Sequence, residues 1–380
     1  MRMLHLISSA GMYGAEAVVL NLTTAQKEQS HEPVIGVLHN RHRPHLEIAA
    51  EARKRGLAVE IFACQGRFDR STVRSIRDFV TANSIEVVHT HGYKSDIYGR
   101  FAVKGLNTAF VATCHLWTRS TRSVRFYEFL DSLILRSARR VVGVSDAITE
   151  ALAQSGIPET KLATVYNGTD LSRFEAPVRT LRDELGIGDG LLIGTVGRLE
   201  TQKGIEYFIR AAREVLGEFP AAQFVVIGEG SLRAQLNGLI RDLRLGANIR
   251  LLGERTDMPG VYASLDLFVL ASIDEGMPMT ILEALASSRP VLATRVGAVD
   301  KLVVPDITGL LMESKDVNAL RDAMLRCLRD PDFARMLGTN GARHVRNSFS
   351  AGAMASNYAE IYSQALRAGE PCAIPVCQGS

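Results

Sequence analysis

The stretch Asp274-Glu275-Gly276-Met277-Pro278-Met279-Thr280-Ile281-Leu282-Glu283-Ala284 holds the most informative pattern in this chain. Proline lacks an N–H group and fits the first position of a helix, so we predict that a helix begins at Pro278. Glu275 then lies on the loop before this helix, and Glu283 lies inside it, five residues or about 7.5 Å past Pro278 along the helix axis. The free N–H groups and the dipole of such a helix start attract an anion.

The two glutamates suggest what else this site would bind. Carboxylates cannot bind the anion, but they accept hydrogen bonds from hydroxyl groups. An anion flanked by hydroxyl groups describes a nucleoside diphosphate with a sugar at each end. The same acids also fit an ordinary helix start, where the dipole favours negative charge, so their spacing alone leaves both interpretations open.

Composition sets the class of protein. With 380 residues, 46% of them hydrophobic and 22% charged, the chain fits two globular domains of similar size. It contains no apolar run near the roughly 20 residues that span a bilayer, and it begins with a short apolar strand without a signal pattern. Five scattered cysteines, without metal-ligand spacing, fit a reducing compartment. We therefore expect a cytoplasmic protein.

Strand and helix patterns alternate along the chain, which predicts an α/β fold with two doubly wound, Rossmann-like domains facing a cleft. We place a first domain at residues 1–175 and a second at 176–350. A helix at 351–367 is expected to pack back on the first domain, and 368–380 to form a disordered tail. The expected strands lie at residues 3–7, 34–38, 59–62, 85–89, 110–113, 140–144, 191–196, 224–227, 249–252, 267–270 and 290–294. Among the expected helices, one begins at Pro331 and ends at Gly338, and no element is assigned to residues 145–164.

A loop with two glycines, Gly11 and Gly14, follows the first strand and precedes a helix. This order can bring backbone N–H groups to a phosphate, although two glycines at this spacing are more often a simple tight turn. The loop is not G-x-G-x-x-G, and the second half has no such motif either. The dinucleotide site of an oxidoreductase is therefore not predicted.

Three histidines are expected where two neighbouring strands of the first domain end. His89 and His91 share one face of a strand by the two-residue period, and His115 ends the next strand. Ligands of doubly wound sheets bind at this edge, although any one histidine can also be structural. Because no Asp, Glu or Cys accompanies them at ligand spacing, we predict no zinc site.

Two cations, Arg198 and Lys203, bracket the loop after the first strand of the second domain. They would meet a diphosphate with a helix N-terminus behind them, or they would be solvated loop residues.

Taken together, these residues resemble the retaining glycosyltransferases of family 4, whose fold is called GT-B. The similarity extends over residues 1–365, and its most specific element is the E-x7-E pattern of Glu275 and Glu283. Other matching segments are Gly197-Arg198-Leu199 with Lys203-Gly204, Asn167-Gly168-Thr169-Asp170, Pro290-Val291 and Thr308-Gly309-Leu310-Leu311.

The resemblance implies roles for the matching residues. Arg198 and Lys203 would hold the donor pyrophosphate, Glu275 the hydroxyls of the donor sugar, and Glu283 those of the ribose. His115 would lie close to the transferred sugar, which makes Glu275 and His115 the candidate catalytic residues. The remaining candidates are Gly276, Met277, Pro278, Met279 and Gly14 for the donor, and His91 and Tyr13 for the acceptor or sugar.

Three positions depart from the family pattern. Tyr13 replaces the first of two adjacent glycines, Ala298 replaces the second glycine of a later pair, and Asp300 stands where glutamate is commoner. These differences concern local sugar and acceptor contacts rather than the class of reaction.

The implied activity is transfer of a sugar, with retention of configuration, from a UDP- or GDP-sugar to a lipid-linked, polysaccharide or other envelope acceptor. The resemblance implies no metal and no cofactor, because cations and helix N-termini stabilise the leaving diphosphate. No nucleic acid is expected as a partner. The alternatives are a nucleotide-sugar isomerase or epimerase of the same fold, and a non-catalytic protein that binds nucleotide sugars.

Basic and aromatic residues in the first domain suggest peripheral contact with the inner face of an anionic membrane. Arg119, Arg122 and Arg125 are spaced by three and run into an aromatic segment, Phe126 to Leu130. Residues 1–175 contain 22 Lys and Arg against 17 Asp and Glu, a net charge of +5. A helix that packs its apolar residues on the sheet and leaves the arginines in water is the alternative.

Overall fold

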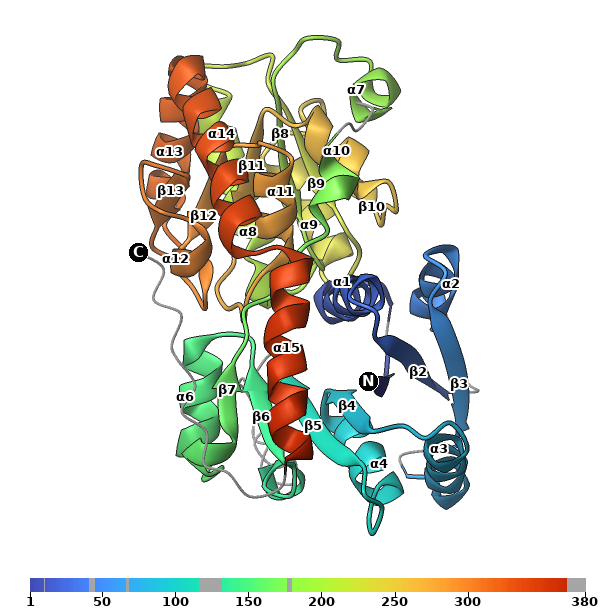
Figure 1. The fold of residues 1–380 in the computed structure, drawn as a ribbon. Coiled ribbons are helices and arrows are strands. Elements are labelled where there is room, and N and C mark those ends of the chain that lie inside the picture. The colour runs from blue at the N-terminus through green and yellow to red at the C-terminus, as the bar shows by residue number, and fades with distance from the viewer. Residues whose placement is uncertain (10, 41–44, 66–67, 116–131, 176–179, 368–380) are drawn as a thin grey trace. The chain divides into compact units, whose positions relative to one another are not determined.

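The computed structural model describes residues 1–9, 11–40, 45–65, 68–115, 132–175 and 180–367, and it divides into two compact units (Figure 1). The first unit is Met1–Gly168 together with helix α15 (Ala351–Leu366). The second unit is Thr169–Ser350. The basic and aromatic segment expected to contact a membrane falls in residues 116–131, outside the described residues.

A parallel sheet of seven strands forms the centre of the first unit. Its order is β3-β2-β1-β4-β5-β6-β7, so the fourth strand pairs with the first. The central strands are buried on both faces, which favours apolar residues there, whereas the edge strand β3 is only partly buried. The strands are β1 (Arg2–Ile7), β2 (Glu32–Asn40), β3 (Ala58–Cys64), β4 (Val87–His91), β5 (Ala109–Cys114), β6 (Arg140–Gly143) and β7 (Leu162–Thr164).

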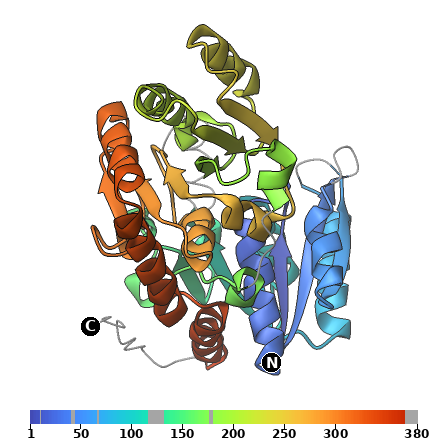
Figure 2. The same ribbon diagram turned by 90° about the horizontal axis from the view of Figure 1, so that it is seen from above.

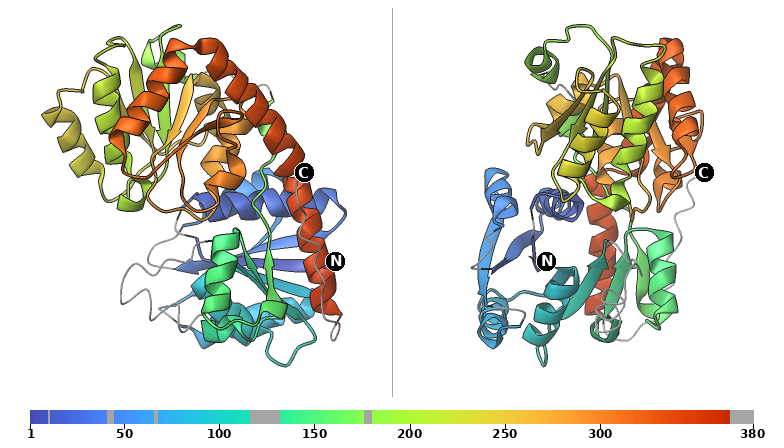
Figure 3. Two further views of the ribbon diagram at one scale, coloured as in Figure 1. Left: turned by 90° about the vertical axis from the view of Figure 1, so that its left-hand side faces the viewer. Right: turned by 180° about the vertical axis from the view of Figure 1, so that it is seen from behind.

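Helices cover both faces of this sheet, as Figure 3 shows. Helices α1 (Gly14–Glu28), α2 (Glu47–Lys54) and α15 pack together on one face. Helices α3 (Arg70–Ala82) and α4 (Tyr93–Ala102) pack on the other. Along the chain, helix α6 (Asp146–Gln154) and the short helix η1 (Glu159–Lys161) connect β6 to β7.

The second unit has a parallel sheet of six strands in the order β10-β9-β8-β11-β12-β13. The order again reverses between the first and fourth strands of the unit. The strands are β8 (Leu192–Val196), β9 (Gln223–Ile227), β10 (Ile249–Gly253), β11 (Leu267–Leu270), β12 (Val291–Thr294) and β13 (Gly309–Met312).

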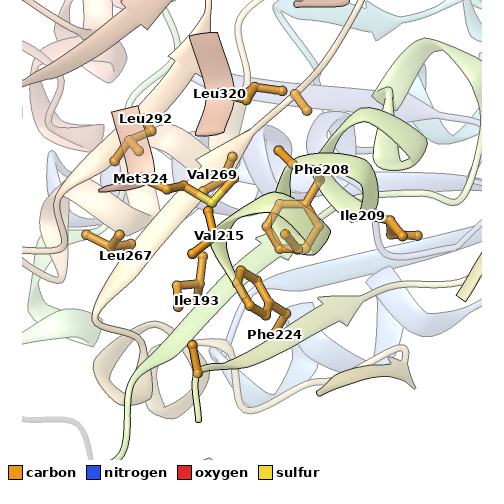
Figure 4. Close-up of a cluster of buried hydrophobic side chains, with 14 of the residues drawn as sticks. Ile193, Phe208, Ile209, Val215, Phe224, Leu267, Val269, Leu292, Leu320 and Met324 are labelled. Atoms are coloured by element: carbon orange, nitrogen blue, oxygen red, sulfur yellow. The ribbon is translucent and has the colours of Figure 1, made fainter. Parts of the chain in front are cut away.

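A large apolar core lies between this sheet and helices α8 (Ile205–Val215), α9 (Arg233–Asp242) and α13 (Val317–Arg329). Phe208 of α8 meets Phe224 of β9 edge to face, with ring centroids 5.9 Å apart, and Met324 of α13 belongs to the same cluster (Figure 4). Burying such side chains is the main favourable term in folding. The other elements of the unit are η2 (Leu171–Phe174), α7 (Thr180–Leu185), η3 (Thr201–Lys203), α10 (Met258–Ser264), α11 (Met279–Ala286), α12 (Val299–Leu302) and α14 (Pro331–Ser348).

The predicted α/β class and the two doubly wound sheets are confirmed, and Figure 2 shows the helices that flank each sheet. Two details differ. The prediction assigned no element to residues 145–164, where α6 and β7 form. It also ended a helix at Gly338, whereas α14 continues to Ser348.

The glycines of α14 explain the second difference. A Cβ on Gly338 would lie 2.3 Å from the Ser288 carbonyl oxygen, and one on Gly341 would lie 2.4 Å from a Leu285 methyl carbon. These glycines let the helix approach its neighbours closely, so they do not mark its end. Within the described residues, every helix is too short or too polar to cross a lipid bilayer.

Candidate functional site

The first candidate site lies in the second unit, where β8 and β11 run side by side and end at the same edge. In parallel sheets, ligands bind beyond the carboxyl ends of the strands at the point where the strand order reverses. Lys203 and the exposed Arg198 lie in the loop after β8, and Glu275 lies in the loop after β11. The topology therefore brings together residues that are far apart in sequence.

An ion pair joins the two loops. The Lys203 ammonium donates a hydrogen bond of 2.6 Å to Glu275 Oε1. Ser272 Oγ donates to the same oxygen over 2.7 Å. The Glu275 side chain is 8% exposed and that of Lys203 18%, so the pair is partly shielded from water and its Coulomb attraction is stronger than that of a surface pair. The site thus holds its lysine in a fixed place.

Glycines without a Cβ atom allow these loops to approach one another. Gly204 has a positive φ of 58°, and a Cβ there would lie 2.0 Å from the Ala271 carbonyl oxygen. Gly297 has a φ of 57°, and a Cβ there would lie 2.1 Å from the carbonyl oxygen of Glu275. Any other residue at either position would be strained and would force the loops apart.

The helix after Glu275 begins one residue later than predicted. Helix α11 starts at Met279, and Pro278 is its N-cap with an extended backbone (φ −73°, ψ 117°). A proline ring fixes φ but leaves ψ free, so Pro278 can precede the first turn as well as open it. Gly276, Met277, Pro278 and Met279 are all buried, and the Gly276 carbonyl accepts a hydrogen bond of 2.9 Å from Ala298 N–H.

Glu283 lies inside α11, as predicted, and is held by a tyrosine that the sequence did not indicate. The Tyr262 hydroxyl donates a hydrogen bond of 2.8 Å to Glu283 Oε2. Burial raises the pKa of Tyr262 well above its ordinary value, and the nearby Glu283 carboxylate raises it further. Tyr262 therefore stays protonated and orients the carboxylate.

The second candidate site lies in the first unit, beside the pairing of β1 with β4. His5 of β1 is the register partner of His89 of β4. His5 Nδ1 lies 3.2 Å from His91 Nε2, and His91 Nδ1 lies 3.1 Å from His115 Nε2. The predicted histidines do come together, and His5 joins them from a strand that is distant in sequence.

These imidazoles are kept neutral by burial. His5, His89 and His91 are almost fully buried, and His115 is partly exposed. Desolvation lowers the pKa of His5 and His115 to about 4 and that of His89 and His91 well below the ordinary value.

The nitrogen atoms of His5, His89 and His91 that could bind a metal lie within 4.8 Å of one another. This spacing could suit a metal ion, although the sequence predicted no zinc site. Both ring nitrogens of each histidine already have a hydrogen-bond partner. None of those partners is a carboxylate that would balance the charge of a buried cation. The arrangement therefore fits a hydrogen-bonded network better than a metal site.

Tyr13 and Gly14 stand at the start of α1 in the first unit. Tyr13 is the N-cap, and its N–H donates to Glu16 Oε2 over 3.2 Å. Gly14 is the first residue of the helix and is exposed. A Cβ on Gly11 would lie 2.8 Å from the Tyr13 ring, so the ring covers that glycine.

The predicted site residues thus fall into two groups, one in each unit. Sequence reasoning missed Ser272 and Tyr262, which hold the two glutamates, and His5. In the sequence, only His5 could have been noticed, as a polar residue within an apolar strand. Its place beside His89 still depended on the strand pairing, which the sequence does not show.

Family models match both halves of the chain. A model described as "Glycosyltransferase Family 4" matches residues 12–173, and "Glycosyl transferases group 1" matches residues 178–344. The chain belongs to the family 4 glycosyltransferases. As a member of that family it is an enzyme that transfers a sugar, and the isomerase and non-catalytic alternatives are not supported.

Relatives named as glycosyltransferases resemble this chain over most of its length. An Escherichia coli UDP-Gal:alpha-D-GlcNAc-diphosphoundecaprenol alpha-1,3-galactosyltransferase is 28% identical over 74% of this chain and 76% of its own. A Rhizobium leguminosarum lipopolysaccharide core mannosyltransferase is 30% identical over 61% of this chain and 66% of its own. Anabaena Alr3699/HepE, solved with UDP-glucose, has a TM-score of 0.84 at 20% identity, covering 96% of this chain and 99% of its own, and so shares its GT-B fold.

We predict that the Lys203–Glu275 pair is energetically coupled. Lys203→Met and Glu275→Gln should each destabilise the second unit, because the remaining partner is left without its counter-charge in a shielded site. In urea unfolding of the full chain, the double variant should lose about 0.5–3 kcal/mol less than the sum of the single losses.

The exposed pair Glu218–Arg329, at 2.7 Å, provides the matched control. A double-mutant cycle with Glu218→Gln and Arg329→Met should give a coupling free energy of less than about 1 kcal/mol. Additive losses at Lys203 and Glu275 would show that their contact contributes nothing.

A second prediction concerns pH. The four network histidines are neutral when folded but take up protons near pH 6.5 when unfolded, so acid favours the unfolded chain. The free energy of unfolding of the first unit should reach its full value above pH 7. It should fall from pH 6.5 toward pH 4, by up to about 1.4 kcal/mol per pH unit for each histidine. Urea unfolding at stepped pH measures this slope. His5→Gln should reduce it by one histidine's share, and equal slopes in wild type and variant would contradict the assignment.

Proposed function

We propose that this enzyme is a retaining, metal-independent glycosyltransferase that takes its sugar from a UDP- or GDP-sugar. The acceptor is a lipid-linked glycan, a polysaccharide or another component of the cell envelope. The observation that carries this proposal is the Lys203–Glu275 contact at the carboxyl ends of β8 and β11, beside the start of α11.

This arrangement suits a diphosphate leaving group. Negative charge grows on the diphosphate as the bond to the sugar breaks, and fixed cations stabilise it. An ammonium has three N–H donors, so Lys203 can keep its bond to Glu275 and donate to phosphate oxygens as well. Arg198 and the free N–H groups at the start of α11 would add to this stabilisation, and for that reason we propose that no metal is needed.

The carboxylates of this unit would orient the donor. In the described residues, the Lys203 and Ser272 hydrogen bonds to Glu275 both end on Oε1. Oε2 is then the oxygen that accepts hydrogen bonds from the donor sugar, and Glu283 would accept those of the ribose. The backbone from Gly276 to Met279 would face the phosphates.

Residues of the first unit complete the proposed set. His115 would contact the transferred sugar and Gly14 the diphosphate, while His91 and Tyr13 are proposed for the acceptor or the sugar. We propose that retention arises by substitution on one face of the sugar within an ion pair, because the sequence shows no residue that must act as a covalent nucleophile.

The relatives support the choice of substrates. The Escherichia coli relative is named for a UDP-galactose donor and a diphosphoundecaprenol-linked acceptor, and the Rhizobium leguminosarum relative for the lipopolysaccharide core. A Corynebacterium glutamicum relative, 31% identical over 48% of this chain, is named for GDP-mannose and a phosphatidylinositol mannoside. UDP- and GDP-sugars with envelope acceptors are therefore the first to test.

The decisive experiment is a transfer assay with UDP- and GDP-sugars and undecaprenyl diphosphate-linked acceptors. Nucleoside diphosphate release should depend on the acceptor and continue in EDTA, and NMR of the product should show the donor's anomeric configuration. Glu275→Ala should lower turnover by about 100-fold or more, because it removes a contact to the reacting sugar.

Glu218→Ala is the matched control, since it removes another glutamate that pairs with a cation, beyond the opposite end of α8. It should leave turnover unchanged, and both variants must retain the second unit's unfolding transition. A folded Glu275→Ala enzyme with near-normal turnover would falsify the assignment. Strict dependence on Mg²⁺ or Mn²⁺, or an inverted product, would contradict the proposed mechanism.

We further propose that the first unit docks on the anionic inner face of the membrane through Arg119, Arg122 and Arg125 and the aromatic residues after them. The net charge of +5 over residues 1–175 supports this proposal, as does the lipid-linked acceptor named for the Escherichia coli relative. Each arginine near an anionic surface contributes about 1 kcal/mol.

Sedimentation with liposomes tests this proposal. Binding should require phosphatidylglycerol, weaken with salt and fall roughly 100-fold when the three arginines become Ser. A triple Ser variant at Arg213, Arg241 and Arg343, exposed arginines of the second unit, should bind as wild type does. Binding that ignores lipid charge would refute the docking surface.

A further inference from the structure

A continuous chain of hydrogen bonds connects the amide of Gln26, inside the first unit, to the partly exposed His115. Gln26 Oε1 lies 2.8 Å from His5 Nε2. His5 Nδ1 lies 3.2 Å from His91 Nε2, and His91 Nδ1 lies 3.1 Å from His115 Nε2. Helix α1, strands β1 and β4 and the residue directly after β5 each contribute one part of this chain.

The Gln26 amide oxygen determines which nitrogen of each histidine in this chain donates and which accepts. An amide oxygen only accepts hydrogen bonds, so His5 must carry its proton on Nε2. A neutral imidazole has one donor and one acceptor, and His5 Nδ1 is therefore the acceptor for His91 Nε2–H. By the same rule His91 Nδ1 accepts from His115 Nε2–H. His115 is left with a lone pair on Nδ1.

A second branch from Gln26 obeys the same direction. Gln26 Nε2 donates to the Tyr362 hydroxyl over 3.3 Å, and that hydroxyl lies 2.7 Å from His89 Nδ1. Tyr362 can then donate to His89 Nδ1, and His89 Nε2–H can donate to Thr113 Oγ1 over 2.7 Å. Both branches are satisfied with the Gln26 oxygen toward His5, which is the orientation that this structure has, and helix α15 contributes Tyr362 to the second branch.

Burial makes a single misplaced proton in this chain costly. Gln26, His5, His89 and Tyr362 are fully buried, so moving one proton to the other nitrogen of its ring would leave a donor or an acceptor without a partner, and only a turn of the Gln26 amide together with every imidazole would avoid this. Each such loss costs about 1–3 kcal/mol. A relay of neutral imidazoles also places no charge beside His115.

We propose that Gln26, acting through His5 and His91, fixes the tautomer of His115, so that His115 presents Nδ1 as a hydrogen-bond acceptor to a hydroxyl group of the donor sugar. This inference rests on the proposed function for the contact between His115 and the sugar. Gln26, His5 and His91 are positioning residues, because they act through His115. The relay itself is a property of the free enzyme and can be tested without any substrate.

The direct test is ¹H–¹⁵N correlation NMR of the imidazoles in the full-length enzyme, with His115→Gln used to assign the His115 signals. Long-range correlations distinguish the two neutral tautomers and the imidazolium. At pH 7 we expect a single neutral form of His115 with its proton on Nε2. A proton on Nδ1, a mixture of tautomers or an imidazolium in the wild-type enzyme would overturn the proposal.

Gln26→Met tests the origin of the tautomer, because it keeps the side-chain volume and removes the acceptor oxygen. His115 should then become a mixture of both neutral tautomers, and kcat/KM for the donor should fall roughly 3- to 10-fold, the equivalent of one hydrogen bond.

Gln29→Met is the matched control. Gln29 caps the C-terminus of the same helix and also bonds to α15, at the Gly352 carbonyl over 2.9 Å and at Ser356 Oγ over 3.0 Å, but it has no hydrogen bond to the relay residues. It should change neither the tautomer nor kcat/KM. An unchanged His115 tautomer in Gln26→Met would refute the relay.

The outcomes also separate this inference from the proposed function. A correct tautomer in an enzyme that never uses a nucleotide sugar would keep the relay and reject the function. A wrong tautomer in an active glycosyltransferase would reject the relay and keep the proposed function.

Discussion

The reversal of strand order in each sheet is the constraint on which both sites depend. Because β4 pairs with β1 and β11 pairs with β8, residues that are about 70 to 85 positions apart in sequence become neighbours. In the first unit this pairing places His5 beside His89, and in the second it places Lys203 beside Glu275. A doubly wound sheet therefore assembles chemistry that no local motif contains.

The two sites manage polar groups in opposite ways. At Lys203 and Glu275 the protein keeps two charges and shields them only partly, so the site can still exchange hydrogen bonds with an anionic ligand. In the histidine network the protein removes charge altogether, because deep burial keeps every imidazole neutral. The first arrangement suits stabilisation of a leaving group, and the second suits a fixed pattern of donors and acceptors.

Much of this could be predicted from the sequence, for identifiable reasons. Apolar runs such as that of β8 predicted the strands of both sheets. The E-x7-E spacing predicted Glu275 on a loop and Glu283 in a helix. The contacts of Glu275 with Ser272 and of Glu283 with Tyr262 were not predicted, because they depend on side-chain directions. Gly338 was misread because sequence alone does not separate a helix stop from a close approach.

A crystal structure of the full chain with a UDP- or GDP-sugar would test the central claim most directly. The account predicts the diphosphate within hydrogen-bond distance of Lys203 Nζ and the N–H groups at the start of α11, with the ribose at Glu283 and the sugar at Glu275. A donor bound elsewhere, or a diphosphate that leaves the Lys203–Glu275 loops untouched, would contradict it.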